Sequence, residues 1–315
     1  MASAEGVSNA LKVPAHAYAH LRLLRLPNVV TACADSVAGW AIMRAIFPGS
    51  VERDALFPLA LASAGLYLSG LVFNDVADWK TDAVARPERP IPSGAAPLRN
   101  AVWLGVLLMF GGLAAAACIS LPALLHAVAL ALAVLAYDFG TNHGPVGPLN
   151  LGLCRYLNLQ LGMSASTAFA PNWLDCGLFW SLHAPALGLG LYAAGLTALA
   201  VQEESGAKLL PLLLGGASCA AGMLLAAWGM LYWLGWPPLM LLAALLAVLA
   251  WRLLAKGGAE RAKQLVLAGV LGICVFDAAL LLGWRGAGGW PYALVLALLP
   301  LPALVLGRVI SQREA

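Results

Sequence analysis

Residues 100–137 read NAVWLGVLLMFGGLAAAACISLPALLHAVALALAVLAY and contain no Asp, Glu, Lys or Arg. The run is about twice the ~20 residues that an α-helix needs to cross the hydrocarbon core of a bilayer. Ser120-Leu121-Pro122 interrupts it near the middle, and proline breaks a helix at little cost where the chain reaches an interface. The stretch therefore predicts a hairpin of two membrane-spanning helices.

The rest of the chain repeats this pattern. A second uncharged run extends from Leu209 to Trp251, and the whole sequence is 62% hydrophobic and only 10% charged, against roughly 25% charged in a soluble domain. Long, uniformly apolar runs favour helices over the alternating strands of a membrane β-barrel. We expect an all-α, polytopic transmembrane bundle of about ten apolar spans, at residues 28–47, 56–73, 100–118, 122–137, 149–169, 180–201, 209–230, 237–255, 264–283 and 290–308.

The basic residues predict how the chain is oriented. When the loops are assigned alternately to the two sides of the bilayer, one side receives most of the positive charge. That side holds Lys12, Arg22, Arg25, Lys80, Arg86, Arg89, Arg99, Lys208, Arg252, Lys256, Arg261, Lys263, Arg308 and Arg313. Only Arg44, Arg53 and Arg285 fall on the other side. We therefore expect a cytoplasmic-membrane protein with both termini and the region 75–89 in the cytoplasm.

This topology divides the chain into three parts. Residues 1–27 are expected to form a cytoplasmic or interfacial segment, residues 28–308 the helix bundle, and residues 309–315 a cytoplasmic tail. The net charge of +3 follows from the topology, so the sequence predicts the lipid bilayer as a partner and no nucleic acid.

An acidic cluster follows the second span, in the sequence Asn74-Asp75-Val76-Ala77-Asp78-Trp79-Lys80-Thr81-Asp82. On a continuous helix, Asp75, Asp78 and Asp82 would share one face. Three carboxylates that close repel one another unless a cation neutralises them, and Mg²⁺ prefers carboxylate, water and phosphate oxygens. The cluster therefore predicts a Mg²⁺-held diphosphate. The proline-stiffened loop 86–94 adds Arg86 and Arg89 as phosphate ligands, although an ordinary solvated loop would have the same composition.

Charged residues within the spans also indicate a site, because they are expensive in lipid and usually face a cavity or a partner. Arg155, Asn158 and Gly162 fall on one helix face, which predicts a cavity wall; the alternative is an arginine that reaches toward the interface. Asp35 and Asp277 are intramembrane carboxylates. Each would pair with Arg155, act as a base, or remain protonated and hydrogen-bonded.

Aromatic side chains lie near these polar groups. Their faces can stabilise an allylic cation, and interfacial aromatic belts explain them equally well. They are Phe73, Trp79, Tyr156 and Tyr192.

The motifs NDxxDxxxD (74–82) and RPxRPIPSG (86–94) resemble the UbiA superfamily of intramembrane prenyltransferases. Further segments are similar to its EboC-like branch: Arg25-Leu26-Pro27-Asn28-Val29, Gly147-Pro148-Leu149-Asn150 and Gly195-Leu196-Thr197. The resemblance implies a nine-helix bundle around a central cavity that opens laterally to lipid. It also implies two facing aspartate motifs with Mg²⁺ between them, in which Asp75, Asp78 and Asp82 bind metal and act in catalysis and Asn74 orients the ligand. The tenth span is then an addition or half of a split helix.

Two segments depart from the family pattern. The second aspartate motif is missing, and Glu203 and Glu204 are the carboxylates at its position; they point about 100° apart on a helix, so one of them binds a second Mg²⁺ or both are solvated. The lysine that many members carry after the fourth span is absent as well, where this chain has Tyr137 to His143.

The resemblance implies transfer of a prenyl group from a Mg²⁺-bound prenyl diphosphate to a small acceptor. A non-catalytic carrier of a lipid-linked or cyclitol-like molecule is the alternative, because it would need only the first motif. The residues expected to bind substrate are Asn74, Lys80, Arg86, Arg89, Tyr137, His143, Arg155, Asn158, Tyr192, Glu203 and Glu204.

Overall fold

The computed structural model describes residues 15–25, 28–51, 53–141, 144–175, 178–200 and 209–301. Within these ranges the chain is a helix bundle without a β-strand. The long helices are α3 (Val29–Ile46), α4 (Leu56–Ala77), α6 (Leu98–Ala117), α7 (Leu121–Ala136), α8 (Val146–Met163), α10 (Phe179–Ala200), α12 (Leu209–Trp228), α13 (Trp236–Lys256) and α14 (Ala259–Arg285). The shorter ones are α2 (Ala15–Leu24), α5 (Trp79–Ala85), α9 (Phe169–Asn172) and α15 (Trp290–Leu298).

The predicted spans are confirmed as helical, since each of the ten ranges overlaps a helix along most of that helix's length. Eight helical segments of the described chain are long and apolar enough to cross a membrane. Helix α8 is not among them because polar side chains, Arg155 and Gln160 included, interrupt it. One of the eight segments, Ala259–Leu298, covers the last two predicted spans. A short turn at Gly286–Gly289 separates α14 from α15 within it, so the final span begins as a helix of its own.

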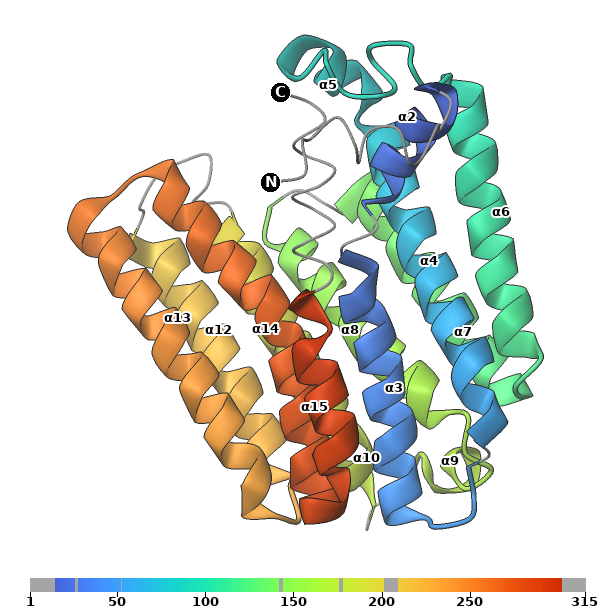
Figure 1. Ribbon diagram of the computed structural model, residues 1–315, viewed down its shortest axis with the longest axis vertical. Coiled ribbons are helices and arrows are strands. Elements are labelled where there is room, and N and C mark those ends of the chain that lie inside the picture. The colour runs from blue at the N-terminus through green and yellow to red at the C-terminus, as the bar shows by residue number, and fades with distance from the viewer. Residues whose placement is uncertain are drawn as a thin grey trace, which may run out of the picture.

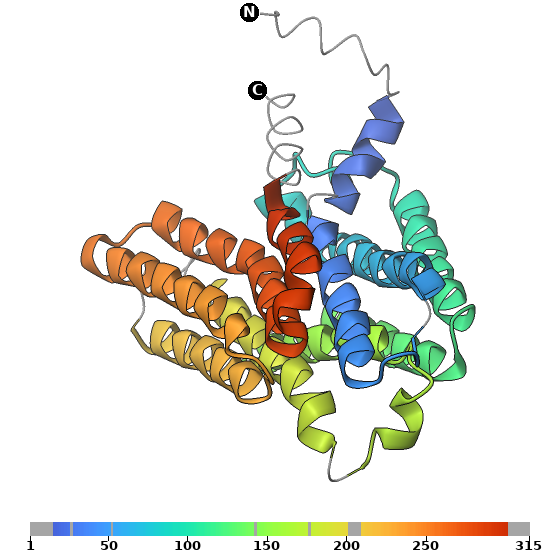
Figure 2. The same cartoon turned by 60° about the horizontal axis from the view of Figure 1, so that its bottom comes forward.

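The bundle consists of two groups of helices (Figures 1 and 2). One group contains α3, α4, α6, α7 and α8, and the other contains α10, α12, α13, α14 and α15. The groups are joined where α8 packs on α10 and where α3 packs on α14. The central cavity lies at this junction.

Small residues bring α3 and α8 unusually close together. A methyl group on Gly162 would overlap the backbone carbonyl of Ser36, and one on Gly39 would lie 3.0 Å from the backbone nitrogen of Met163. Glycine at both crossing points lets the two backbones touch, which is the usual way that helices associate in lipid. This contact fixes the position of α8, which carries Arg155, against α3.

One end of the bundle is covered by α2, α5 and the loop after α5 (Figure 1). Ala19 and Leu23 of α2 are buried in a small apolar cluster with Val72, Ile91 and Ala96. The α2 segment therefore packs against the end of α4, at the same end as the acidic cluster.

Candidate functional site

The acidic cluster does not form the continuous helix that its spacing predicts. Helix α4 ends at Ala77, Asp78 has non-helical dihedral angles (φ −85°, ψ 1°), and α5 begins at Trp79. Asp75 and Asp82 are buried and Asp78 is half-buried. The expectation of one continuous helix is therefore wrong, but Asp75 and Asp82 still face the same side, since both contact Arg89.

Two arginines hold the outer carboxylates. The Arg25 Nη2 atom lies 2.5 Å from Asp75 Oδ1, and Arg89 Nη1 lies 2.5 Å from Asp82 Oδ2 and 3.4 Å from Asp75 Oδ1. Arg89 is held there by its loop, in which the Ser93 backbone N–H donates to the Arg89 carbonyl at 3.0 Å. Arg89 thus bridges α4 and α5, and its positive charge offsets the repulsion between the carboxylates of Asp75 and Asp82.

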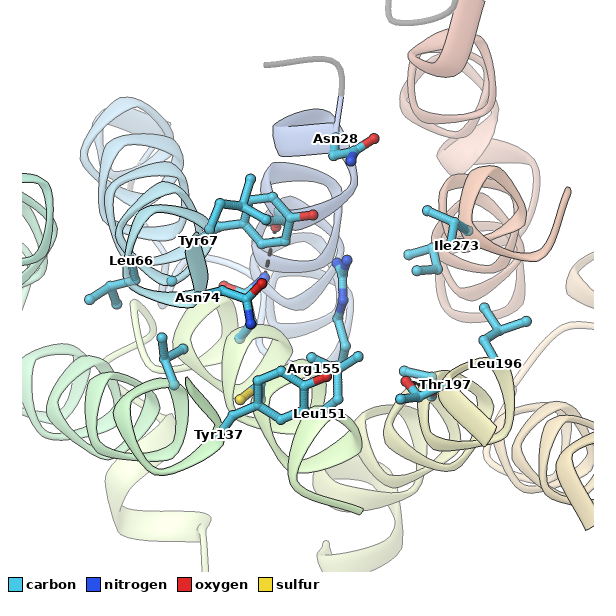
Figure 3. A pocket seen from close by; sticks show the side chains of 18 of the residues that line it. Asn28, Leu66, Tyr67, Asn74, Tyr137, Leu151, Arg155, Leu196, Thr197 and Ile273 are labelled. Carbon is cyan, nitrogen blue, oxygen red and sulfur yellow. Dashed lines mark hydrogen bonds between the residues drawn. The ribbon is translucent and has the colours of Figure 1, made fainter. Parts of the chain in front are cut away.

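A cavity of about 400 Å³ opens beside the cluster, within the roughly 300–1,000 Å³ typical of ligand pockets. Residues of α3, α4, α7, α8, α10 and α14 line it, and half of the lining residues are Leu, Val, Ile or Ala. Figure 3 shows Arg155 in the middle of the cavity between two walls. Tyr67, Asn74 and Tyr137 lie on one side, and Leu196, Thr197 and Ile273 on the other.

Asn74, Tyr137 and Asp138 form the part of the wall nearest the acidic cluster. Asp138 is buried in the π-helical turn Tyr137–Thr141 and lies close to Asn74, while Asp75 and Asp78 act on it electrostatically. Within the described part of the chain, its Oδ2 atom has no hydrogen-bond partner. Sequence reasoning missed Asp138 as a site residue; the available signal was a carboxylate at the very end of an apolar span.

The deeper part of the wall is a hydrogen-bonded network around Arg155. Arg155 Nη1 donates to Asp35 Oδ2 at 2.8 Å and Nη2 to Thr31 Oγ1 at 3.0 Å. Asn158 Nδ2 donates to Asp35 Oδ2 at 2.9 Å, and Ser63 donates to Asn158 Oδ1 at 2.8 Å. The expected pairing of Asp35 with Arg155 is confirmed, and Arg155 and Asn158 line the cavity. The face that carries them also packs on α3, a role that the sequence did not predict.

Other predicted residues lie away from the cavity. Tyr192 is fully buried between α10 and α14, where its hydroxyl donates to the Gly269 carbonyl at 2.9 Å, so its assignment as a substrate ligand is corrected to a packing role. Lys80 and Arg86 are exposed on the segment that follows α4. Tyr156 bonds to His183 at 2.8 Å. His143, Glu203 and Glu204 lie outside the described residues.

Phe73, Trp79 and Tyr67 differ in their burial and in their position relative to the cavity. Phe73 is buried with its ring centroid 6.0 Å from that of Phe139, and Trp79 is exposed beside Lys80. Tyr67, which the sequence did not single out, lines the cavity, and its ring lies 5.5 Å from the Arg155 guanidinium. Of the aromatic rings near the site, Tyr67 and Tyr137 are therefore the ones that face the cavity.

The oxygen atoms at this end of the cavity fit a hard cation. In the described ranges, no three His, Cys, Asp or Glu side chains are close enough to hold a metal ion by themselves. Magnesium sites commonly use one or two carboxylates and complete their shell with water and substrate phosphate. Asp138, with one unpartnered carboxylate oxygen, Asn74 and the nearby Asp78 have the donor chemistry of such a site.

Comparisons with known proteins show the family and agree with the fold. A model of the UbiA prenyltransferase family matches residues 36–267. The digeranylgeranylglyceryl phosphate synthase of Saccharolobus solfataricus is 28% identical over 156 residues, which are 49% of this chain and 54% of that protein. The synthase of the same name from Methanoculleus marisnigri is 27% identical over 243 residues, 69% of this chain and 81% of that protein. The chain thus spans about half the length of the first of these relatives.

A solved structure gives an independent comparison of the fold. A UbiA homologue from Aeropyrum pernix K1, solved in its apo form, matches with a TM-score of 0.61 at 19% sequence identity. The match covers 80% of this chain and 96% of that chain. At this identity the likeness is one of fold.

Proposed function

The chain belongs to the UbiA prenyltransferase family and is an integral, multi-pass membrane protein, and on this premise we propose that it binds a prenyl diphosphate in its central cavity and transfers the prenyl group to a small acceptor. The polarity of the cavity carries the proposal. Arg25, Asn28, Asn74 and Asp138 gather at the end next to the acidic cluster, and the walls beyond are mostly aliphatic. An anionic head with a long apolar tail is the ligand that such a cavity suits.

The polar end is proposed to bind the diphosphate. Asn74, Asp78 and Asp138 would hold Mg²⁺, which, when bound, neutralises the diphosphate and stabilises it as a leaving group. Arg25 and Arg89 are placed beside them by Asp75 and Asp82, and their remaining N–H groups would donate to phosphate oxygens. The role of Asp75 and Asp82 is then to orient these arginines as well as to attract the metal.

The aliphatic part of the cavity is proposed to hold the prenyl chain. Leu66, Val134, Leu151 and Val270 would contact the chain and keep water from the reacting carbon. The Tyr137 ring, next to the polar end, would face positive charge that develops on that carbon. Arg155 and Asn158 lie deeper and would donate hydrogen bonds to a polar group of the acceptor. The excess of basic residues at the acidic-cluster end supports a cytoplasmic position for this end.

Ligand binding and turnover test the proposal separately. Purified protein in lipid nanodiscs is mixed with radiolabelled geranylgeranyl diphosphate and Mg²⁺, and bound label is counted. We expect binding that chelation of Mg²⁺ abolishes and that Asp78→Asn weakens about tenfold or more, as the loss of a contact to a charged group does. Asp54→Asn, which changes an exposed carboxylate between α3 and α4, is the matched control. Wild-type protein that does not bind, or Asp78→Asn that binds as tightly as wild type, would contradict the proposal.

A non-catalytic carrier is the second candidate. It is favoured by the ion pairs of Asp75 and Asp82 with Arg89, because a carboxylate that is already paired has less need of a cation. Diphosphate release in the presence of a cell extract that supplies acceptors separates the two functions. Mg²⁺-dependent release supports the transferase, and tight binding without release over many hours supports the carrier.

A further inference from the structure

Asp277 is a carboxylate that the proposed reaction does not use. It lies on α14, is 0% exposed, and neither of its carboxylate oxygens has a hydrogen-bond partner among the residues that the structure describes. Its side chain lies within hydrogen-bonding reach of Asp35 on α3, which is also 0% exposed and whose Oδ1 atom has no partner. Three unpartnered carboxylate oxygens therefore meet in one buried place, although buried polar atoms in proteins are nearly always hydrogen-bonded.

The charges in this place do not balance if both carboxylates are ionised. Arg155 is the cation that pairs with Asp35, at 2.8 Å. The other titratable groups that act on this cluster are Tyr67 from α4, Cys33 from α3 and Cys274 from α14, and none of them supplies a positive charge. An uncompensated charge in such surroundings is very expensive, and the group takes up a proton instead.

A single proton explains both the missing partners and the charge. Two ionised carboxylates only accept hydrogen bonds, so they cannot bond to each other. If one of them is protonated, its O–H donates to the other, and the contact becomes a strong hydrogen bond to a charged group. Asp35 already accepts from Arg155 and Asn158 through Oδ2, which stabilises its ionised form and leaves Asp277 as the acid.

We propose that Asp277 is a positioning residue whose protonated carboxyl group donates a hydrogen bond to Asp35 Oδ1 and thereby holds the Asp35–Arg155 ion pair that presents the Arg155 guanidinium to the cavity. The arrangement links α14, α3 and α8, so both helix groups contribute to the placement of one cavity side chain. The assignment of Asp277 rests on the buried cluster itself. The consequence for ligand binding rests on the proposed function.

Infrared spectroscopy tests the protonation without any ligand. The difference spectrum between wild type and Asp277→Asn in nanodiscs at neutral pH should contain the C=O stretching band of a protonated carboxylic acid. The difference between wild type and Asp54→Asn should contain only carboxylate bands, because Asp54 is exposed. A carboxylate band in place of the acid band for Asp277 overturns the proposal.

Two substitutions at Asp277 test the positioning. Asparagine keeps a neutral donor at this position, so Asp277→Asn should retain folded yield and bind geranylgeranyl diphosphate with Mg²⁺ within about twofold of wild type. Leucine has a similar volume and no donor, so Asp277→Leu should weaken binding about tenfold or abolish folding. If asparagine is no better than leucine in yield and binding, the proposal is wrong. If wild-type protein does not bind while the acid band is present, the proposed function fails and the Asp277 assignment stands.

Discussion

The close crossing of α3 and α8 makes Gly162→Ala the most informative single change. The added methyl group would overlap the Ser36 carbonyl oxygen, and because the obstacle is backbone, no side-chain rotation relieves it. Overpacking of this kind destabilises by about 1–3 kcal/mol. The substitution also removes a helical glycine, which by itself stabilises by about 0.5–1 kcal/mol.

A matched control separates these two effects. Gly111 lies in the middle of α6 with nothing within 4 Å of an added methyl group, so Gly111→Ala gains helix propensity without the overlap. The two variants should therefore differ in the free energy of unfolding by about 1–3 kcal/mol, which is the overpacking term alone. SDS titration of the protein in detergent micelles, followed by circular dichroism, measures the difference. Equal stability of the two variants would show that α3 and α8 are not in backbone contact.

Two further changes test separate parts of the structure. Arg89→Ala leaves Asp75 and Asp82 without their shared cation, so it should lower the unfolding free energy by about 1–3 kcal/mol and weaken diphosphate binding; a variant as stable as wild type argues against the bridge. Tyr192→Phe removes the hydrogen bond to the Gly269 carbonyl and should lower the unfolding free energy by about 1 kcal/mol without changing the affinity for geranylgeranyl diphosphate. A changed affinity for this ligand would indicate that Tyr192 takes part in binding it.

The helices were predictable because their signal is local. An uncharged run that is long enough to cross the bilayer can be identified without information about its neighbours. The turns between such runs are marked by proline and glycine. The family resemblance likewise depended on two short contiguous motifs. Arg155 and Asp35 were identified as possible partners because so few charges occur within the spans that the choices were limited.

The details of the site were not predictable because they depend on contacts between distant segments. Nothing in the sequence around Asp78 marks the bend between α4 and α5. The carboxylates on either side of the bend, Asp75 and Asp82, are bridged by Arg89 from the loop that follows α5. Asp138 looks like an interfacial residue until the turn that carries it is placed against Asn74. Tyr192 looks like a site residue until its hydroxyl is seen to bond to the Gly269 carbonyl of α14.

The pairing of Asp35 with Arg155 also has a consequence for biosynthesis. The two residues are 120 positions apart, so at 5–20 residues per second a ribosome needs roughly 6–24 s to add the second after the first. An unpaired aspartate at the centre of an inserted helix is unfavourable by about 2.5–3.5 kcal/mol. During this interval α3 would be retained beside the insertion machinery, and release of the nascent chain into lipid would follow the arrival of α8.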